Sequence, residues 1–355
     1  MLYYIIIVIL LSMIGLLLYP LEKGIRKRVF GIYSVIILTF IAGFRESVGG
    51  DTSNYISFYN YVISSSFLDI IKYNYEKGFI IYCYILSRIS KNPQFLILIS
   101  SFIINISVII FLYKNSKYFA FSIILYINLT YFYSFMNLMR FGLSVALILQ
   151  AYNYLKSNNY KIYFIFTLLA ILFHNSAIIF LITWFFRKKT FSNYYFSLII
   201  IISILITIYF HSFENIAFAL FPMYKIYKNN IFFQGFRPAN IIMAIMYLII
   251  LIIIRLISKN KINKIDSDDL EMFLFTIGES FSILAIASTI IGRFSLIFLI
   301  FGLIVISNSF KNIKNKINRI TFIYTIYIVS FAYNIIIIYY RPEWFLVTPY
   351  RNVLF

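Results

Sequence analysis

The chain has 355 residues, of which 62% are hydrophobic and only 12% are charged. A soluble domain of this length is about half apolar and about a quarter charged, so the composition excludes that class and indicates an integral membrane protein. The formal net charge of +19 does not indicate a nucleic-acid partner, because the basic residues punctuate the ends of apolar blocks and form no face of their own.

Apolar blocks recur from the start of the chain to its end. Leu2–Tyr19 is predicted to be a retained span, because no basic leader precedes it and no small-residue cleavage site follows. A helix needs about 20 predominantly apolar residues to cross the hydrocarbon, and Ile201–Phe210, Ile241–Ile257 and Ile320–Tyr340 all lie in such blocks. The sequence therefore predicts an all-α polytopic protein, a single membrane domain over residues 1–355 with about 10 to 13 membrane helices.

Basic breaks between the apolar blocks orient the predicted spans. Four of them are predicted to be cytoplasmic: Glu22–Arg28, Arg187–Lys189, Lys259–Lys264 and Lys311–Arg319. This orientation leaves two longer loops on the outer side, at about 45–77 and 211–237. Within the first loop, the apolar spacing over Asn54–Ile63 suits a short helix that lies in the membrane interface.

The region 78–186 admits two topologies. If Lys114–Lys117 and Lys156–Lys161 are cytoplasmic, residues 78–90 dip without crossing and 161–186 forms a hairpin that turns at His174–Ser176. Each arm then has about 12 residues, or about 18 Å of helix, which is too short to span and indicates a re-entrant pair lining a cavity. Alternatively, both basic breaks lie outside and 161–186 is one span.

The orientation gathers ionisable residues at the outer ends of the apolar blocks. An ionisable group near the hydrocarbon costs about 2.5–3.5 kcal/mol or more, so it usually faces a cavity or a partner. The guanidinium fork of arginine suits a phosphate, and several arginines around one outer cavity would suit a diphosphate on a lipid carrier. The alternative for each arginine is that it only reaches toward headgroups. The residues are Arg45, Asp51, Arg140, His174, Arg237, Arg293 and Arg341.

Four of the polar residues have distinct sequence surroundings. Arg140 and Arg293 are each the only charge between two apolar blocks. Asp51 follows Gly49 and Gly50, so it either approaches a ligand or caps the next helix. Glu279 lies near the middle of a predicted span and is either paired or part of an ion path.

His174 is either a catalytic residue or a hydrogen-bonded structural histidine in its apolar run. It does not indicate a metal site, because the other histidine is His211 and no cluster of cysteines or carboxylates accompanies it.

Three short motifs follow one another along the chain. They are Gly43-Phe44-Arg45 followed by Val48-Gly49-Gly50-Asp51 and Tyr55, then Asn137–Leu143 around Arg140, and then Phe173–Ala177. In this order they resemble the amino-terminal signature, the central arginine motif and the FHxSA element of EpsG-like, Wzy-type polysaccharide polymerases. Phe141 stands where the central motif often has glutamine, and Arg293 and Pro349-Tyr350 also fit.

The resemblance implies an enzyme of the bacterial inner (cytoplasmic) membrane that needs no cofactor. Such enzymes join oligosaccharide repeat units carried on undecaprenyl diphosphate, on the outer face, by transferring the growing chain to a sugar hydroxyl of the next unit. Membrane lipids, a chain-length regulator and a flippase are the further partners that it implies.

Candidate roles follow for these residues and for other polar and aromatic residues of the predicted outer side. The candidate catalytic residues are Arg140 and, as proton acceptor, Asp51 or His174. Tyr55 and Trp344 are candidates for stacking on sugar rings. The candidate substrate-binding residues are Arg45, Gly50, Tyr55, Arg237, Arg293 and Arg341.

Three other functions remain open. A flippase of the same lipid-linked units should have paired charges within its spans and two similar halves, and neither is evident. A membrane O-acyltransferase should have an arginine or aspartate close to its histidine, and the run around His174 has neither. A glycan ligase shares the donor chemistry.

Overall fold

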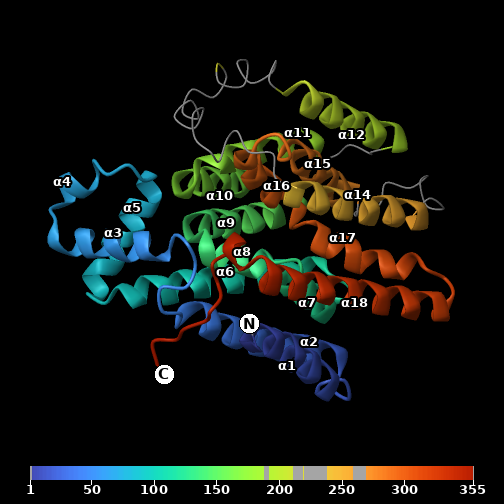
Figure 1. Cartoon of the computed structure of the whole chain (residues 1–355), viewed down its shortest axis with the longest axis horizontal. Helices are drawn as coiled ribbons and strands as arrows, with labels where there is room; N and C mark the ends of the chain where they lie inside the picture. Colours follow the sequence, from blue (N-terminus) through green and yellow to red (C-terminus); the bar gives the residue numbers. More distant parts are fainter. Residues whose placement is uncertain (1, 188–191, 211–218, 220–237, 259–268, 355) are drawn as a thin grey trace. The chain divides into compact units, whose positions relative to one another are not determined.

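The computed structural model describes the whole chain except residues 1, 188–191, 211–218, 220–237, 259–268 and 355 (Figure 1). The described residues form helices joined by turns, with one isolated antiparallel bridge between Arg45 and Asn352. The predicted all-α class is confirmed. The chain divides into two compact units, which we call unit 1 (Met1–Leu181 with Ile320–Phe355) and unit 2 (Ile182–Arg319).

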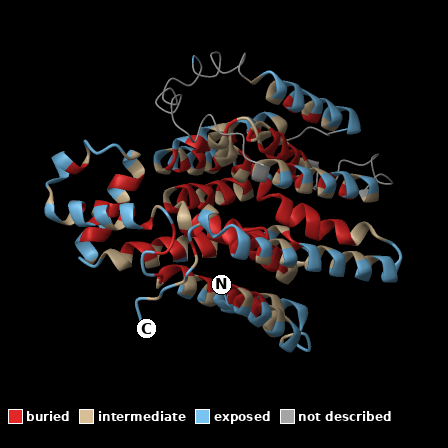
Figure 2. Ribbon diagram, viewed as in Figure 1, coloured by how far each residue is buried: buried red, intermediate tan, exposed pale blue. Residues whose placement is uncertain are grey.

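Unit 1 is built around α9, which is buried over most of its length (Figure 2). α9 packs against α6 and α10. At the α6 contact, a Cβ on Gly142 would lie 2.8 Å from Ile104 Cδ1, so the glycine allows the two helices to approach closely. The elements are α1 (Leu2–Leu17), α2 (Lys23–Gly43), α3 (Thr52–Ser64), α4 (Phe67–Ile70), α5 (Lys77–Ile89), α6 (Pro93–Asn115), α7 (Phe119–Asn128), α8 (Tyr131–Asn137), α9 (Met139–Lys156), α10 (Tyr160–Phe173), η1 (Asn175–Ile182), α18 (Lys316–Tyr340) and η6 (Pro342–Trp344).

Unit 2 centres on α15, which packs against α12, α14 and α16. Gly278 in α15 makes the close contact with α16, because a Cβ there would lie 2.5 Å from the Leu299 backbone nitrogen. The elements are α11 (Thr183–Phe186), α12 (Asn193–Ile208), α14 (Pro238–Ser258), α15 (Asp269–Leu284), η4 (Thr289–Ile291), α16 (Gly292–Leu299), α17 (Gly302–Ser309) and η5 (Phe310–Asn312).

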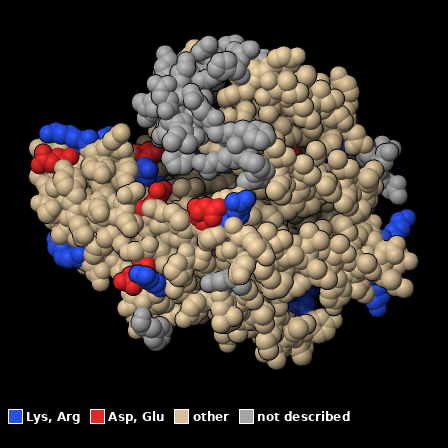
Figure 3. Space-filling view, in the orientation of Figure 1, with Lys and Arg blue, Asp and Glu red and all other residues tan. Residues whose placement is uncertain are grey.

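Fewer helices meet the criteria for a membrane span than the 10 to 13 predicted. Among the described residues, three helices are long and apolar enough, and up to five if each of two bent pairs counts as one span. Several other apolar helices have about 16 residues or fewer, and 16 residues rise about 24 Å, less than the hydrocarbon thickness of about 30 Å. Charged side chains are sparse on the face shown in Figure 3, which agrees with a membrane-embedded protein.

The chain reverses after α10, as the hairpin interpretation predicted. α10 ends at Phe173, His174 is extended, and the chain continues as η1. The Tyr163 hydroxyl donates to the Phe180 carbonyl at 3.0 Å, so η1 runs back along α10. The helix expected over Asn54–Ile63 is also present, as α3. Of the second predicted outer loop, at 211–237, all but Ala219 lies outside the described residues.

Candidate functional site

The loop after α2 is fixed by Arg45. Its side chain is 1% exposed, and its guanidinium donates to the carbonyls of Ala42, Val48 (3.1 Å) and Met136 (2.9 Å) and to Ser101 Oγ (3.2 Å). Burial lowers the pKa of Arg45 to about 10, which leaves it charged at neutral pH. The geometry therefore favours a structural role for Arg45 over the predicted contact with substrate.

The glycines that follow place Asp51 beside the central arginine motif. Gly49 has a φ of +98°, which favours glycine, and a Cβ there would lie 3.3 Å from Asn137 Cα. A Cβ on Gly50 would lie 3.2 Å from Asn137 Oδ1. The Asp51 backbone N–H donates to the same Oδ1 at 3.2 Å. Asp51 is the residue before α3, but its side chain makes no capping hydrogen bond, so the carboxylate is not used as the predicted cap.

Arg140 lies in the first turn of α9, on the other side of Asn137. α7 and α8 form a helix bent by 55°, and the chain restarts at Met139 as an 18-residue helix. The first N–H groups of a helix lack partners within it and carry the positive end of its dipole. The Arg140 side chain adds a full positive charge there and is 21% exposed. This position suits an anion.

Aromatic rings surround the Arg140 guanidinium. Its carbon lies 4.0 Å from the Tyr75 ring centroid and 5.9 Å from that of Phe79. Burial raises the pKa of Tyr55 to about 12, and the charge of nearby Arg140 opposes this rise. Tyr55 is only 2% exposed and packs edge-on to Phe79, so its ring face is not open for the predicted stacking on sugar.

His174 forms the turn between α10 and η1 and is 7% exposed. Its Nδ1 lies 2.7 Å from Ser176 Oγ and accepts the Ser176 N–H at 3.3 Å. Its ring meets that of Phe141, the residue after Arg140, at 5.4 Å between centroids. The turn and the start of α9 are thus adjacent.

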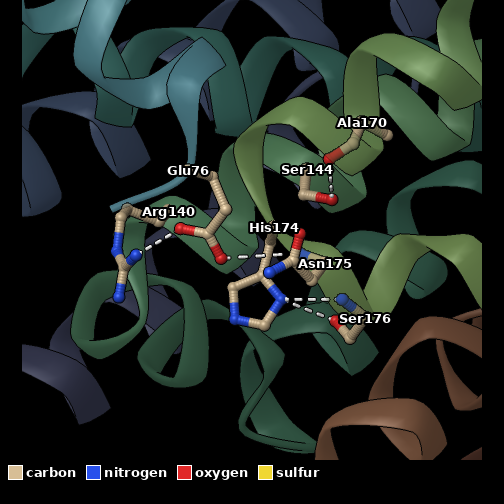
Figure 4. Close-up of polar contacts among 7 residues, drawn as sticks. All are labelled: Glu76, Arg140, Ser144, Ala170, His174, Asn175 and Ser176. Carbon is tan, nitrogen blue, oxygen red and sulfur yellow. Dashed lines mark hydrogen bonds and ion pairs between the residues drawn. The ribbon is translucent and has the colours of Figure 1, made fainter. Parts of the chain in front are cut away.

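Glu76 connects these two elements, although it belongs to none of the motifs predicted from the sequence. One carboxylate oxygen, Oε2, pairs with Arg140 Nη1, and the other, Oε1, accepts the backbone N–H of Asn175 at 3.4 Å. Figure 4 shows the Glu76 carboxylate between Arg140 and the turn at His174–Ser176. The only signal in the sequence was an isolated carboxylate at the start of an apolar block.

The end of the chain closes over the loop that contains Arg45. The N–H groups of Glu46 and Gly49 donate to the carbonyls of Arg351 (3.0 Å) and Leu346 (2.8 Å). The Tyr350 hydroxyl donates to the Ile41 carbonyl at 3.0 Å. The predicted Pro349-Tyr350 element therefore lies against the amino-terminal signature.

The other predicted residues lie outside this cluster or cannot be compared with it. Arg341 is exposed and pairs with Glu343 at 3.6 Å, and Trp344 lies in η6 of the same segment. Arg293 is half-buried in α16 of unit 2. Arg237 lies outside the described residues, as does His211.

Glu279 is fully buried in α15 of unit 2. Neither of its carboxyl oxygens has a hydrogen-bond partner in the described part of the chain. The described part of the chain contains no group of three or more His, Cys, Asp or Glu side chains that could hold a metal ion. In unit 1, Arg140 offers a guanidinium for an anion, and Asp51, Glu76 and His174 are candidate proton acceptors.

Comparison with known proteins gives one family. The family model described as the EpsG family matches residues 28–352, which is nearly the whole chain. No curated protein matches, and no solved structure matches. The matched range includes Arg140 and the residues described around it: Asp51, Glu76, Asn137 and His174.

Proposed function

The chain belongs to the EpsG family of Wzy-type polymerase-like proteins, and we propose that it polymerises oligosaccharide repeat units carried on undecaprenyl diphosphate. Family membership and the apolar helices support a polysaccharide polymerase-like role in a membrane. The donor, the reaction and the outer face of the bacterial inner membrane are our proposal.

The observation that carries the proposal is the position of Arg140. Three segments that are far apart in the sequence meet near Arg140, which lies at the start of α9. The Gly49–Asp51 turn contacts Asn137, just before α9. The turn at His174 contacts Phe141, and Glu76 binds both this turn and Arg140. The guanidinium is partly exposed and stands at a helix N-terminus, where phosphate groups bind readily. This arrangement suits the diphosphate of a lipid-linked sugar.

The reaction follows from that placement. The hydroxyl oxygen of the acceptor sugar attacks the anomeric carbon of the donor chain, and the bond between that carbon and the diphosphate oxygen breaks. The lipid diphosphate leaves with the bonding electrons, and Arg140 stabilises the charge that develops on it. The hydroxyl proton passes to a carboxylate or imidazole.

Asp51 is the better candidate than His174 for accepting the proton. Asp51 is partly exposed and its carboxylate makes no hydrogen bond in the described part of the chain, whereas His174 is 7% exposed and its Nδ1 contacts Ser176. Asp51 also lies near Tyr55 and Tyr75, which flank Arg140. A proton acceptor must reach the attacking hydroxyl, and exposure favours this.

Gene deletion tests the proposal. The surface polysaccharide of the deletion strain is separated on a gel. Intact spheroplasts are digested from the outside, and the lipid-linked units that were protected from digestion are then extracted. We expect single repeat units on the outer face and no ladder, restored by the wild-type gene. Repeat units trapped on the inner face of the membrane would indicate that the protein is a flippase. Full-length polymer held on the lipid carrier would indicate a ligase. An unchanged chain length with altered acylation would indicate an acyltransferase.

A further inference from the structure

We propose that Glu76 is a positioning residue, which holds Arg140 in line with the turn at His174 and serves as the counter-ion that Arg140 exchanges for the donor diphosphate. The inference rests on the proposed function. It concerns a residue that none of the recognised motifs contains, and its basis is the pair of contacts that one carboxylate makes.

The local structure directs the Glu76 side chain away from its own helix. Glu76 is the N-cap residue of α5, a position at which a side-chain oxygen can accept an N–H from the first turn. Here the side chain makes no such bond, and its oxygens go to Arg140 and to the Asn175 N–H. The contacts join residues that are 64 and 99 positions from Glu76 in the sequence.

Gly78 brings α5 close enough for these contacts. A Cβ on Gly78 would lie 2.6 Å from the carbonyl oxygen of Leu172 and 2.9 Å from its carbonyl carbon. These are backbone atoms, so no side-chain movement would make room for it. The Glu76-Lys77-Gly78 sequence therefore docks the start of α5 on the end of α10, immediately before His174.

The Glu76 carboxylate binds Arg140 where a phosphate group would compete for the same guanidinium. The Arg140 and Glu76 side chains are only 21% and 13% exposed, so their charges are less screened than those of a surface pair. Carboxylate and phosphate oxygens accept the same N–H groups of a guanidinium. When a diphosphate binds Arg140, its negative charge meets the charge of Glu76, so Glu76 must weaken donor binding while it keeps Arg140 aligned.

Glu76→Gln should lower both KM and kcat, so that donor binding improves while the catalytic rate falls. The amide has the same shape and still accepts the Asn175 N–H, but it carries no charge. We expect the KM for the donor to fall by about threefold, because the repulsion is removed, and kcat to fall by about tenfold, because Arg140 is less well aligned. A residue that only stabilised the fold would not lower KM.

The experiment uses the full-length protein in nanodiscs and, as substrate, the lipid-linked units extracted from the deletion strain. Initial rates of chain growth are measured against donor concentration for the wild type, Glu76→Gln and Asp69→Asn. Asp69 is a matched control in the same part of unit 1, because it also pairs with a basic residue, Lys72 at 3.6 Å, but is exposed. The unfolding temperature of each variant is recorded, and we expect all three to agree within a few degrees.

A charge reversal gives a second test of this inference, and the wild-type protein tests the proposed function separately. We expect Glu76→Arg combined with Arg140→Glu to fold and remain inactive. The ion pair is kept, but the guanidinium that binds the diphosphate is moved from position 140 to position 76. Recovery of activity in that protein would overturn the inference, as would wild-type KM and kcat in Glu76→Gln. A wild-type protein that does not extend the units at all would contradict the proposed function itself.

Discussion

Arg45 is 1% exposed and bonded to protein oxygens, whereas Arg140 is 21% exposed and faces Glu76 and Tyr75. Both lie in motifs that resemble those of the family, and the sequence predicted that both act on the substrate, Arg140 as a catalytic residue and Arg45 in binding. Only their surroundings distinguish them, and those surroundings come from segments far away in the chain. The two arginines should therefore respond differently to the same substitution.

Arg140→Lys should abolish most activity without loss of folded protein. Lysine keeps the charge but lacks the planar fork that binds two phosphate oxygens. Loss of one such donor to a developing anion usually costs about 100-fold or more in rate. Chain growth on lipid-linked units measures this at equal amounts of folded protein.

Arg88→Lys is the matched control, because Arg88 also stacks on a tyrosine, at 4.5 Å from the Tyr84 ring centroid, and is exposed. Full activity of Arg140→Lys would show that Arg140 only reaches toward headgroups.

Arg45→Lys should instead reduce stability. The ammonium group cannot reach all of the oxygens that the guanidinium contacts, and each buried carbonyl left without a donor costs about 1–3 kcal/mol. We expect a loss of about 3 kcal/mol in the free energy of unfolding, measured in mixed micelles, with near-normal rates for the remaining folded protein. Arg341→Lys provides the comparison, since the exposed pair with Glu343 should contribute less than about 1 kcal/mol. A stable but inactive Arg45→Lys would contradict the structural role.

At the scale of helices, the approach of α5 to α10 determines where Glu76 lies. Gly78→Ala should separate the two helices, because the added methyl group would meet backbone atoms of Leu172. We expect destabilisation of about 1–3 kcal/mol and a larger loss of activity, since Glu76 would lose its hold on Asn175. Gly24→Ala is the control, because a Cβ there meets nothing within 4 Å. Equal effects of the two substitutions on the unfolding temperature and on the rate would refute this account.

The sequence predicted the helices better than it predicted their contacts. The all-α class, the helix over 54–63 and the reversal at His174 follow from local features: the length of apolar blocks, their spacing, and a polar break in an apolar run. Glu76 could not be found in that way, because its partners are 64 and 99 residues away and share no periodicity with it. Apolar length alone also does not show where a helix bends, as the chain does between α7 and α8 at Leu129–Thr130.

At the scale of the whole molecule, both ends of the chain meet at the loop that holds Arg45 and Asp51. Near the amino terminus, the Tyr4 hydroxyl donates to the Val347 carbonyl at 2.8 Å, and its ring meets that of Tyr350 at 5.8 Å. At the other end, the Val353 N–H donates to the Phe44 carbonyl at 3.0 Å. The last 15 residues, after α18, therefore secure the amino-terminal signature of the site.

Removal of residues 341–355 should inactivate the protein while leaving it folded. α18 keeps its own anchors, since Ser330 and Asn334 remain hydrogen bonded to Asn128 at 3.2 and 3.3 Å. The loop after α2 loses its backbone partners, so Asp51 should no longer be held beside Asn137. We expect the rate of chain growth to fall by at least about tenfold, because small displacements of reacting groups have effects of that size.

Two point variants separate the role of the tail from a general effect of truncation. Tyr350→Phe removes only the hydroxyl, which donates to the Ile41 carbonyl and accepts from Asn352 Nδ2, and it should lower stability by about 1 kcal/mol with a partial loss of rate. Leu354→Ala changes a side chain that is 52% exposed, and it should behave as wild type. A truncated protein that extends lipid-linked units at the normal rate would show that the rest of unit 1 holds Asp51 without the tail.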